Sequence, residues 1–167
     1  MIKEKDMKLK RLFLILMILL WAVAVYSLSN EEGEVSSGLS RRIVGFFVKE
    51  EKTIDIVEPY ARKVAHFGEY FIGGILFLLL FRTYSLNDVP TLAYTSIMGT
   101  WYALTDEWHQ KMIIARKASL FDVFIDFLGC ITGACIMLLI IKIIEHIKMK
   151  KKEKNYERFK RRIRPGT

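Results

Sequence analysis

The chain has 167 residues, enough for one domain of ordinary size, and carries 26 Lys and Arg against 18 Asp and Glu, a net charge of +8. Residues 148–167 contain ten basic and two acidic residues, so the whole excess belongs to this C-terminal segment and the rest of the chain is balanced. Long apolar runs fill the balanced part, and 52% of all residues are hydrophobic. These features argue against a nucleic-acid partner and against a compact soluble domain, and they favour a membrane protein with a basic tail.

The first apolar run covers residues 12–28 and contains no charged residue. It follows a basic segment, residues 1–11, like the one that opens a secretory signal peptide. The run has 17 residues, more than the about 7 to 15 of a signal-peptide core, so we expect it to remain as a membrane-spanning anchor. Cleavage near the small residues at 22–24 is the alternative.

The connection that follows, residues 29–63, is too short for a second globular domain. Within it, apolar residues between positions 39 and 47 recur near helical spacing, with Arg41 and Arg42 on the opposite side. This pattern predicts an amphipathic helix. The helix either lies on the outer leaflet of the membrane or folds over the mouth of the bundle.

Three further apolar runs lie at residues 67–81, 89–105 and 127–141. A bilayer core about 30 Å thick needs about 20 helical residues, and each run with its flanks can reach that length. The run at 89–105 is the least apolar, and a buried soluble helix is its alternative, although its small and hydroxylated residues suit close packing between membrane helices. We therefore predict an all-α, integral membrane four-helix bundle over residues 12–144.

The distribution of Lys and Arg predicts the orientation of this bundle. With four spans, 17 basic residues fall on the side of both termini and 9 on the other side. Cytoplasmic segments carry the excess of basic residues, so residues 1–11 and the tail at 145–167 are predicted to be cytoplasmic. The connections at 29–63 and 106–121 then face outward.

Ionisable residues within membrane segments cost about 2.5 to 3.5 kcal/mol each on insertion scales, so they mark functional sites more often than surface charges do. Three polar clusters of this kind fall at the outer ends of the predicted helices. They consist of Lys63, His66, Glu69 and Tyr70; of Asp106, Glu107, His109 and Gln110; and of Arg116, Ser119, Asp122 and Asp126.

Small residues continue two of these clusters down their helices. Gly129 and Gly133 follow the acidic residues of the last helix on one stripe, and Gly73 follows His66 in the same way. We expect the two stripes to pack together, with Gly73 close to Gly129, so that the acidic ends face one another in a protein-lined cavity.

Salt bridges within and between the clusters are expected too, because charges buried in a membrane protein are usually paired. We expect Lys63 to pair with Glu69, and Arg116 to pair with Asp106 or Asp122.

Three blocks occur in a fixed order: KVAHFGEY at 63–70, TDEWHQ at 105–110 and RKASLFDVFIDFLG at 116–129. Together they resemble the signature of VanZ-like bacterial membrane proteins, over about residues 21–139. The most specific part is D-E-x-x-Q followed by R-x-x-S-x-x-D and D-x-x-G. Two departures are visible. Ile114-Ala115 stand where the family commonly has Pro-Gly, and residues 27–30 (SLSN) stand where it often has Ser-Ser-Gln.

The resemblance implies a multi-pass protein of the bacterial cell membrane, in a family whose founding member is associated with resistance to teicoplanin. The resemblance implies a connection with drug resistance but no particular reaction, so two functions stay open.

The first function is binding at the outer face of an envelope lipid, a lipid-linked precursor or a glycopeptide, which would contribute to drug tolerance. Membrane lipids are then partners. The alternative within this non-enzymatic function is that the same groups form a buried ion-pair network that holds the bundle together. The residues assigned to this site are Lys63, Tyr70, Asp106, His109, Gln110, Arg116 and Ser119.

The second function is catalysis, as a hydrolase or transferase acting on a lipid-linked envelope substrate. His66, Glu107, Asp122 and Asp126 are the catalytic candidates, because paired imidazole and carboxyl groups support acid–base chemistry. Ser119 better fits a helix N-cap than a nucleophile. The same group types can hold a divalent metal, but no zinc-protease motif or nucleophile elbow is present, so no residue is assigned as a metal ligand.

Overall fold

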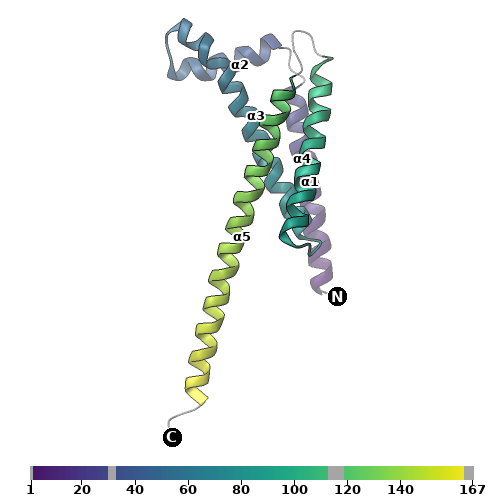
Figure 1. Ribbon diagram of the computed structural model, residues 1–167, viewed down its shortest axis with the longest axis vertical. Coiled ribbons are helices and arrows are strands. Elements are labelled where there is room, and N and C mark those ends of the chain that lie inside the picture. The colour runs from purple at the N-terminus through teal and green to yellow at the C-terminus, as the bar shows by residue number, and fades with distance from the viewer. Residues whose placement is uncertain (1, 30–32, 113–118, 164–167) are drawn as a thin grey trace.

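The computed structural model describes residues 2–29, 33–112 and 119–163, and these are almost entirely helical. Four long helices lie along one another, and a shorter one lies across one end (Figure 1). The start of the first helix and the end of the last both lie toward the opposite end (Figure 1). The helices are α1 (Ile2–Ser29), α2 (Gly33–Phe47), α3 (Glu51–Arg82), α4 (Asp88–Gln110) and α5 (Leu120–Ile163).

The all-α class is therefore confirmed, and three helices are long and apolar enough to cross a membrane. Those candidate spans are Glu4–Ser29, Glu51–Arg82 and Leu120–Arg161. α4 has 23 residues but is not among them, because threonines and serine dilute its apolar residues. Two of these threonines, Thr91 and Thr95, are fully buried, and the Thr95 hydroxyl donates to the Thr91 carbonyl oxygen at 2.8 Å. The four-span topology stays a prediction.

α5 continues without a break into the basic tail, as far as Ile163. It has 44 residues, so the boundary expected at residue 145 falls inside a helix. Residues 142–161 are all exposed, and at about 1.5 Å per residue this segment is about 30 Å long. Lys, Glu and Arg are good helix formers, which explains why the tail stays helical outside the bundle (Figure 1).

The tightest packing joins α3 and α5. A Cβ atom added to Gly129 or Gly133 would overlap the carbonyl oxygen of Phe67 or Phe71, so the α5 backbone lies directly against the α3 backbone. The predicted small stripe on the last helix is thus an interhelical contact.

The partner of this stripe was expected one residue too early. A Cβ on Gly74 would overlap the Cys130 carbonyl oxygen on α5, whereas Gly73 faces the indole ring of Trp21 on α1. The expectation that Gly73 packs near Gly129 is wrong because each helical residue turns by about 100°, which sends neighbouring residues to different helices.

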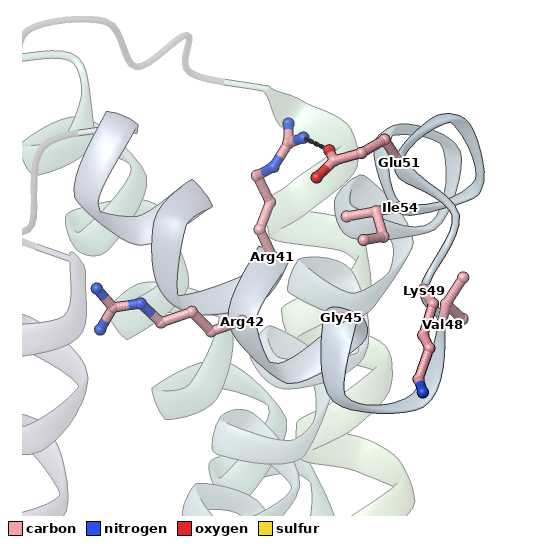
Figure 2. Close-up of a pocket in the computed structure, with 7 residues that line it drawn as sticks. All are labelled: Arg41, Arg42, Gly45, Val48, Lys49, Glu51 and Ile54. Carbon is pink, nitrogen blue, oxygen red and sulfur yellow. Dashed lines mark hydrogen bonds and ion pairs between the residues drawn. The ribbon is translucent and has the colours of Figure 1, made fainter.

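The helix predicted in the connection at 29–63 is α2. Its Arg41 forms ion pairs with Glu51 at 2.9 Å and Asp55 at 2.6 Å on α3, and the Asp55 charge, with help from Glu51, raises the pKa of Arg41 above its usual value. Figure 2 shows the Arg41 side chain directed to Glu51 and the Arg42 side chain directed away from it. All three residues line a hollow of about 410 Å³. These exposed ion pairs lie at the edge of the α2–α3 contact, where the buried side chains of Val44 and Ile54 supply the apolar packing.

The apolar end of α2 faces outward. Phe46 and Phe47 are 83% and 80% exposed and pack edge-to-face on each other. Large exposed aromatic rings are typical of a helix at a membrane surface. They favour the first of the two placements predicted for α2, the one on the outer leaflet, which stays a prediction.

Candidate functional site

Residues from the three predicted clusters meet between α3, α4 and α5. His66 lies on α3, Asp106 on the last turns of α4 and Asp126 near the start of α5. Both aspartates are buried, and His66 is partly buried. His66 Nδ1 lies 3.7 Å from Asp126 Oδ1, and one ligand atom from each of the three residues lies within 4.8 Å of the other two. The structure therefore brings together residues 40 and 60 positions apart in the chain, as the sequence predicted.

Tyr70 lies one helical turn beyond His66 and is completely buried. Its ring packs edge-on against Trp21, and the carboxylates of Asp106 and Asp126 both act on its hydroxyl electrostatically. That hydroxyl has no hydrogen-bond partner within the described part of the chain, and neither does Asp126 Oδ1. Buried polar atoms nearly always have a partner, so these two atoms are exceptional.

Gln110 orients Asp106 at the end of α4. Gln110 Nε2 donates to Asp106 Oδ2 at 2.9 Å and to Ser29 Oγ at 3.4 Å. All three side chains are buried. Ser29 was not among the predicted site residues, although it is the polar residue that ends the first apolar run and lies where the sequence departs from the family pattern.

Ser119 and Glu107 connect the start of α5 to α4. The Ser119 backbone N–H donates to Glu107 Oε1, and Ser119 Oγ accepts from the Phe121 backbone N–H at 3.2 Å. The second bond is that of an N-cap, which confirms the capping role expected for Ser119. The buried Glu107 carboxylate thus holds the first residue before α5.

Lys63 crosses from α3 to α5. Its ammonium group lies 3.1 Å from Asp122 Oδ1 and 4.4 Å from the centre of the Phe121 ring. The salt bridge expected between Lys63 and Glu69, both on α3, is therefore wrong. Lys63 pairs instead with Asp122 on another helix, α5. Arg116 lies outside the described residues, so its pairing with Asp106 or Asp122 stays a prediction.

The second histidine does not join the three-residue group. The His109 ring packs on Tyr26 of α1, with ring centroids 4.6 Å apart. Of the two imidazoles expected at the site, His66 is the one that meets the buried carboxylates.

Aromatic residues fix α1 against the other helices below the site, a role the sequence analysis did not assign. Trp21 Nε1 donates to the Glu69 carbonyl oxygen at 2.8 Å, and the Tyr102 hydroxyl donates to the Ala22 carbonyl oxygen at 2.7 Å. A Trp or Tyr inside an apolar run needs such a partner when it is buried, which is the signal that could have identified them.

An apolar hollow of about 560 Å³ lies beside the site, between α4 and the start of α5. Trp101, Trp108 and Leu120 line it, and Glu107 forms part of its wall. Glu107 therefore belongs both to this apolar surface and to the polar end of the bundle.

Residues 13–142 match the family model described as VanZ/LLP1, a region that includes the whole of α2, α3 and α4 and every predicted site residue. Comparison with curated proteins gave no match, and comparison with solved structures gave none either. The family match covers most of the chain and agrees with the three sequence blocks. The chain therefore belongs to the VanZ/LLP1 family of membrane proteins.

Proposed function

We propose that this VanZ-family chain is a multi-pass protein of the bacterial cell membrane whose polar site faces outward and binds a lipid-linked envelope precursor or an envelope lipid. Through this binding it contributes to tolerance of teicoplanin-type glycopeptides. The observation that carries the proposal is the junction at Glu107, where a buried polar cluster adjoins an apolar hollow.

The junction suits an amphiphile. Ligand pockets combine mostly apolar walls with a few placed polar groups. A lipid chain would lie in the hollow beside Trp101 and Trp108, while its headgroup would meet Glu107, Gln110 and the Lys63 ammonium. A hollow of about 560 Å³ is much too small for a whole glycopeptide, so we favour a lipid or lipid-linked precursor over the drug itself.

The orientation rests on charge. The described parts of the two basic segments, residues 2–11 and 145–163, lie toward the end of the molecule opposite the site (Figure 1). Basic segments next to membrane helices stay on the cytoplasmic side, which supports an outward-facing site and cytoplasmic termini.

A hydrolase or transferase acting on the same lipid-linked substrate is the second candidate. The observation that favours it is the His66 and Asp126 pair at 3.7 Å. An imidazole beside a buried carboxyl group can take up and release a proton during catalysis.

The test compares cells lacking the protein with cells that carry the wild type, Glu107→Gln, Asp126→Asn, or the control Glu157→Gln on the exposed tail. Teicoplanin tolerance is measured together with mass spectrometry of envelope lipids, at equal protein abundance in the membrane. We expect Glu107→Gln and Asp126→Asn to lose tolerance and Glu157→Gln to retain it. Full tolerance in both site variants would contradict the proposal.

The lipid inventory separates the two candidates. Binding predicts the same lipids with and without the protein. Catalysis predicts a substrate that accumulates without the protein, or in the Asp126→Asn cells, and a product that disappears.

A further inference from the structure

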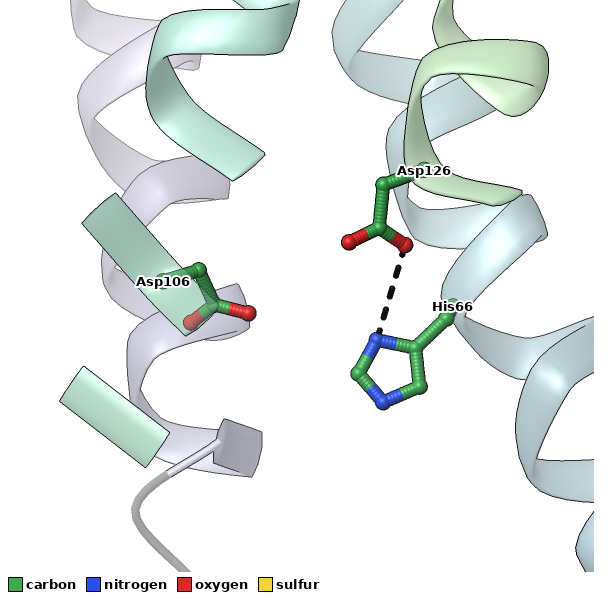
Figure 3. Close-up of side chains that lie close together, drawn as sticks. All are labelled: His66, Asp106 and Asp126. Atoms are coloured by element: carbon green, nitrogen blue, oxygen red, sulfur yellow. Dashed lines mark ion pairs between the residues drawn. The ribbon is translucent and has the colours of Figure 1, made fainter. Parts of the chain in front are cut away.

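We propose that His66, Asp106 and Asp126 bind a divalent metal ion between α3, α4 and α5. Figure 3 shows the His66 ring and the Asp126 carboxylate facing each other, with the Asp106 carboxylate directed toward them from the other side. One nitrogen and two carboxylate groups from three different helices thus enclose one space.

The distances suit a site that closes slightly around an ion. The three ligand atoms lie within 4.8 Å of one another. Bonds of about 2.0 to 2.2 Å hold ligands no more than about 4.4 Å apart, so a shift of about half an ångström would complete the site.

The buried hydroxyl of Tyr70 points to a ligand at this place independently of the three donor groups. This hydroxyl is completely buried, has no hydrogen-bond partner in the described residues, and lies under the electrostatic influence of Asp106 and Asp126. Asp126 Oδ1, in a side chain that is 2% exposed, also lacks a hydrogen-bond partner there. A metal ion and its bound water would give both atoms partners, because ions in open sites keep one or more waters.

The charges balance as well. Neither Asp106 nor Asp126 forms an ion pair with Lys or Arg in the described ranges of the chain, and Lys63 is engaged by Asp122. Two ionised carboxylates and a neutral imidazole carry a charge of about −2, which one divalent cation neutralises.

The donor set indicates the class of metal. Imidazole nitrogen suits zinc and similar transition ions, and carboxylate oxygen also suits manganese, whereas calcium and magnesium prefer oxygen alone. Gln110 donates to Asp106 Oδ2 at 2.9 Å, the kind of outer contact that orients a ligating carboxylate and leaves its other oxygen for the metal.

The experiment uses the full-length chain without a histidine tag, purified in detergent, stripped with EDTA, loaded with zinc or manganese chloride and desalted. Bound metal is counted by mass spectrometry, and the melting temperature is measured with and without metal. We expect about one zinc or manganese ion per chain and a higher melting temperature, with a much smaller effect of calcium.

Two pairs of variants test the residues. Asp126→Asn and His66→Gln should weaken zinc binding at least about tenfold. Asp122→Asn, one turn earlier on α5, and His109→Gln, on the Tyr26 contact, should keep wild-type affinity.

A wild-type chain that retains no metal would overturn the proposal, whatever the variants do, and so would unchanged binding in both Asp126→Asn and His66→Gln. The inference goes beyond the proposed function, since metal binding in detergent requires no envelope ligand. Bound metal in a protein that gives no teicoplanin tolerance would leave the metal site standing and refute the proposed function. Tolerance without bound metal would do the reverse.

Discussion

The carboxylates at the two ends of the helix bundle differ in how fully they are paired with basic groups. At the turn between α3 and α4, Asp88 pairs with Arg82 at 2.6 Å and with Lys142 of α5 at 2.5 Å, and Arg82 also reaches Glu145 at 3.1 Å. At the other end, Asp106, Glu107 and Asp126 are buried, and within the described residues none of the three forms a salt bridge with Lys or Arg. The nearest basic group to Asp126 is His66, whose Nδ1 lies 3.7 Å from Oδ1.

The same turn is held by hydrogen bonds to the first helix. Arg11 donates to the Thr83 hydroxyl at 3.1 Å and to the Thr83 carbonyl oxygen at 2.7 Å. These contacts join groups of complementary charge or polarity from three helices and the turn between two of them.

This difference in pairing indicates which end of the bundle contributes to stability and which end is suited to bind a ligand. Pooled carboxylates repel one another and lose hydration when they are buried, so they do not stabilise a bundle by themselves. A protein retains them where a ligand or an ion compensates. The paired end is thus the structural clamp, and the acidic end is the candidate site.

The largest effect is expected at the α3–α5 contact that supports both ends. Gly133→Leu would place a side chain where the Phe71 carbonyl oxygen lies, and should destabilise the fold by about 3 kcal/mol or more. The measurement is the yield and melting temperature of the purified protein in detergent. Gly68→Leu on α3 is the matched control, since no atom lies within 4 Å of a Cβ there. Equal behaviour of the two variants would contradict the close contact.

A smaller effect should separate the clamp from the site directly. Asp88→Asn removes the carboxylate shared by Arg82 and Lys142, and should lower the melting temperature by a few degrees. Asp126→Asn, measured with EDTA present, should leave the melting temperature unchanged or raise it, because it removes a buried charge that lies near other carboxylates. A larger loss of stability in Asp126→Asn than in Asp88→Asn would remove the distinction between the two ends.

The smallest effect is expected in the pH dependence of stability, through the Asp88 carboxylate. The hydrogen bond from Lys142, together with the charges of Lys142 and Arg82, holds the pKa of Asp88 below its usual value of 3.8. The unfolded chain binds this proton more readily, so the stabilisation is complete above about pH 5 and is lost as the pH falls below about 4.

Melting temperatures of the wild type and Asp88→Asn should therefore differ by a constant amount above pH 5 and converge in acid. A difference that stays constant down to the acid limit of the measurement would show that Asp88 has no lowered pKa.

Particular residues show how far the sequence leads. The apolar runs predicted the long helices, and the polar residues at their ends predicted His66, Asp106, Glu107 and Asp126 as neighbours, because helix direction alone places these ends together. Helix direction could not predict that Gly74, and not Gly73, packs against α5. Nor could it predict that Lys63 pairs with Asp122 and not with Glu69. Both depend on how far each helix is rotated about its own axis, which only packing determines.

The α4 helix shows the same limit from another side. Its threonines made the run at 89–105 the least certain span, and the structure explains their presence by burying Thr91 and Thr95 against the bundle. Ser29 and Tyr102 were missed for a related reason, since their partners Gln110 and Ala22 lie 81 and 80 residues away.

The sequence by itself determined that this is a helical membrane protein of the VanZ/LLP1 family with a basic tail and polar helix ends at one face, because hydropathy, charge count and motif spacing are properties of the chain in order. Only the tertiary structure decided which of those polar groups share a space. His66, Asp106 and Asp126 meet because the glycines of α5 bring its backbone onto α3, with α4 packed against both. Side-chain distances of a few ångströms depend on that packing, and no pattern along the chain encodes them.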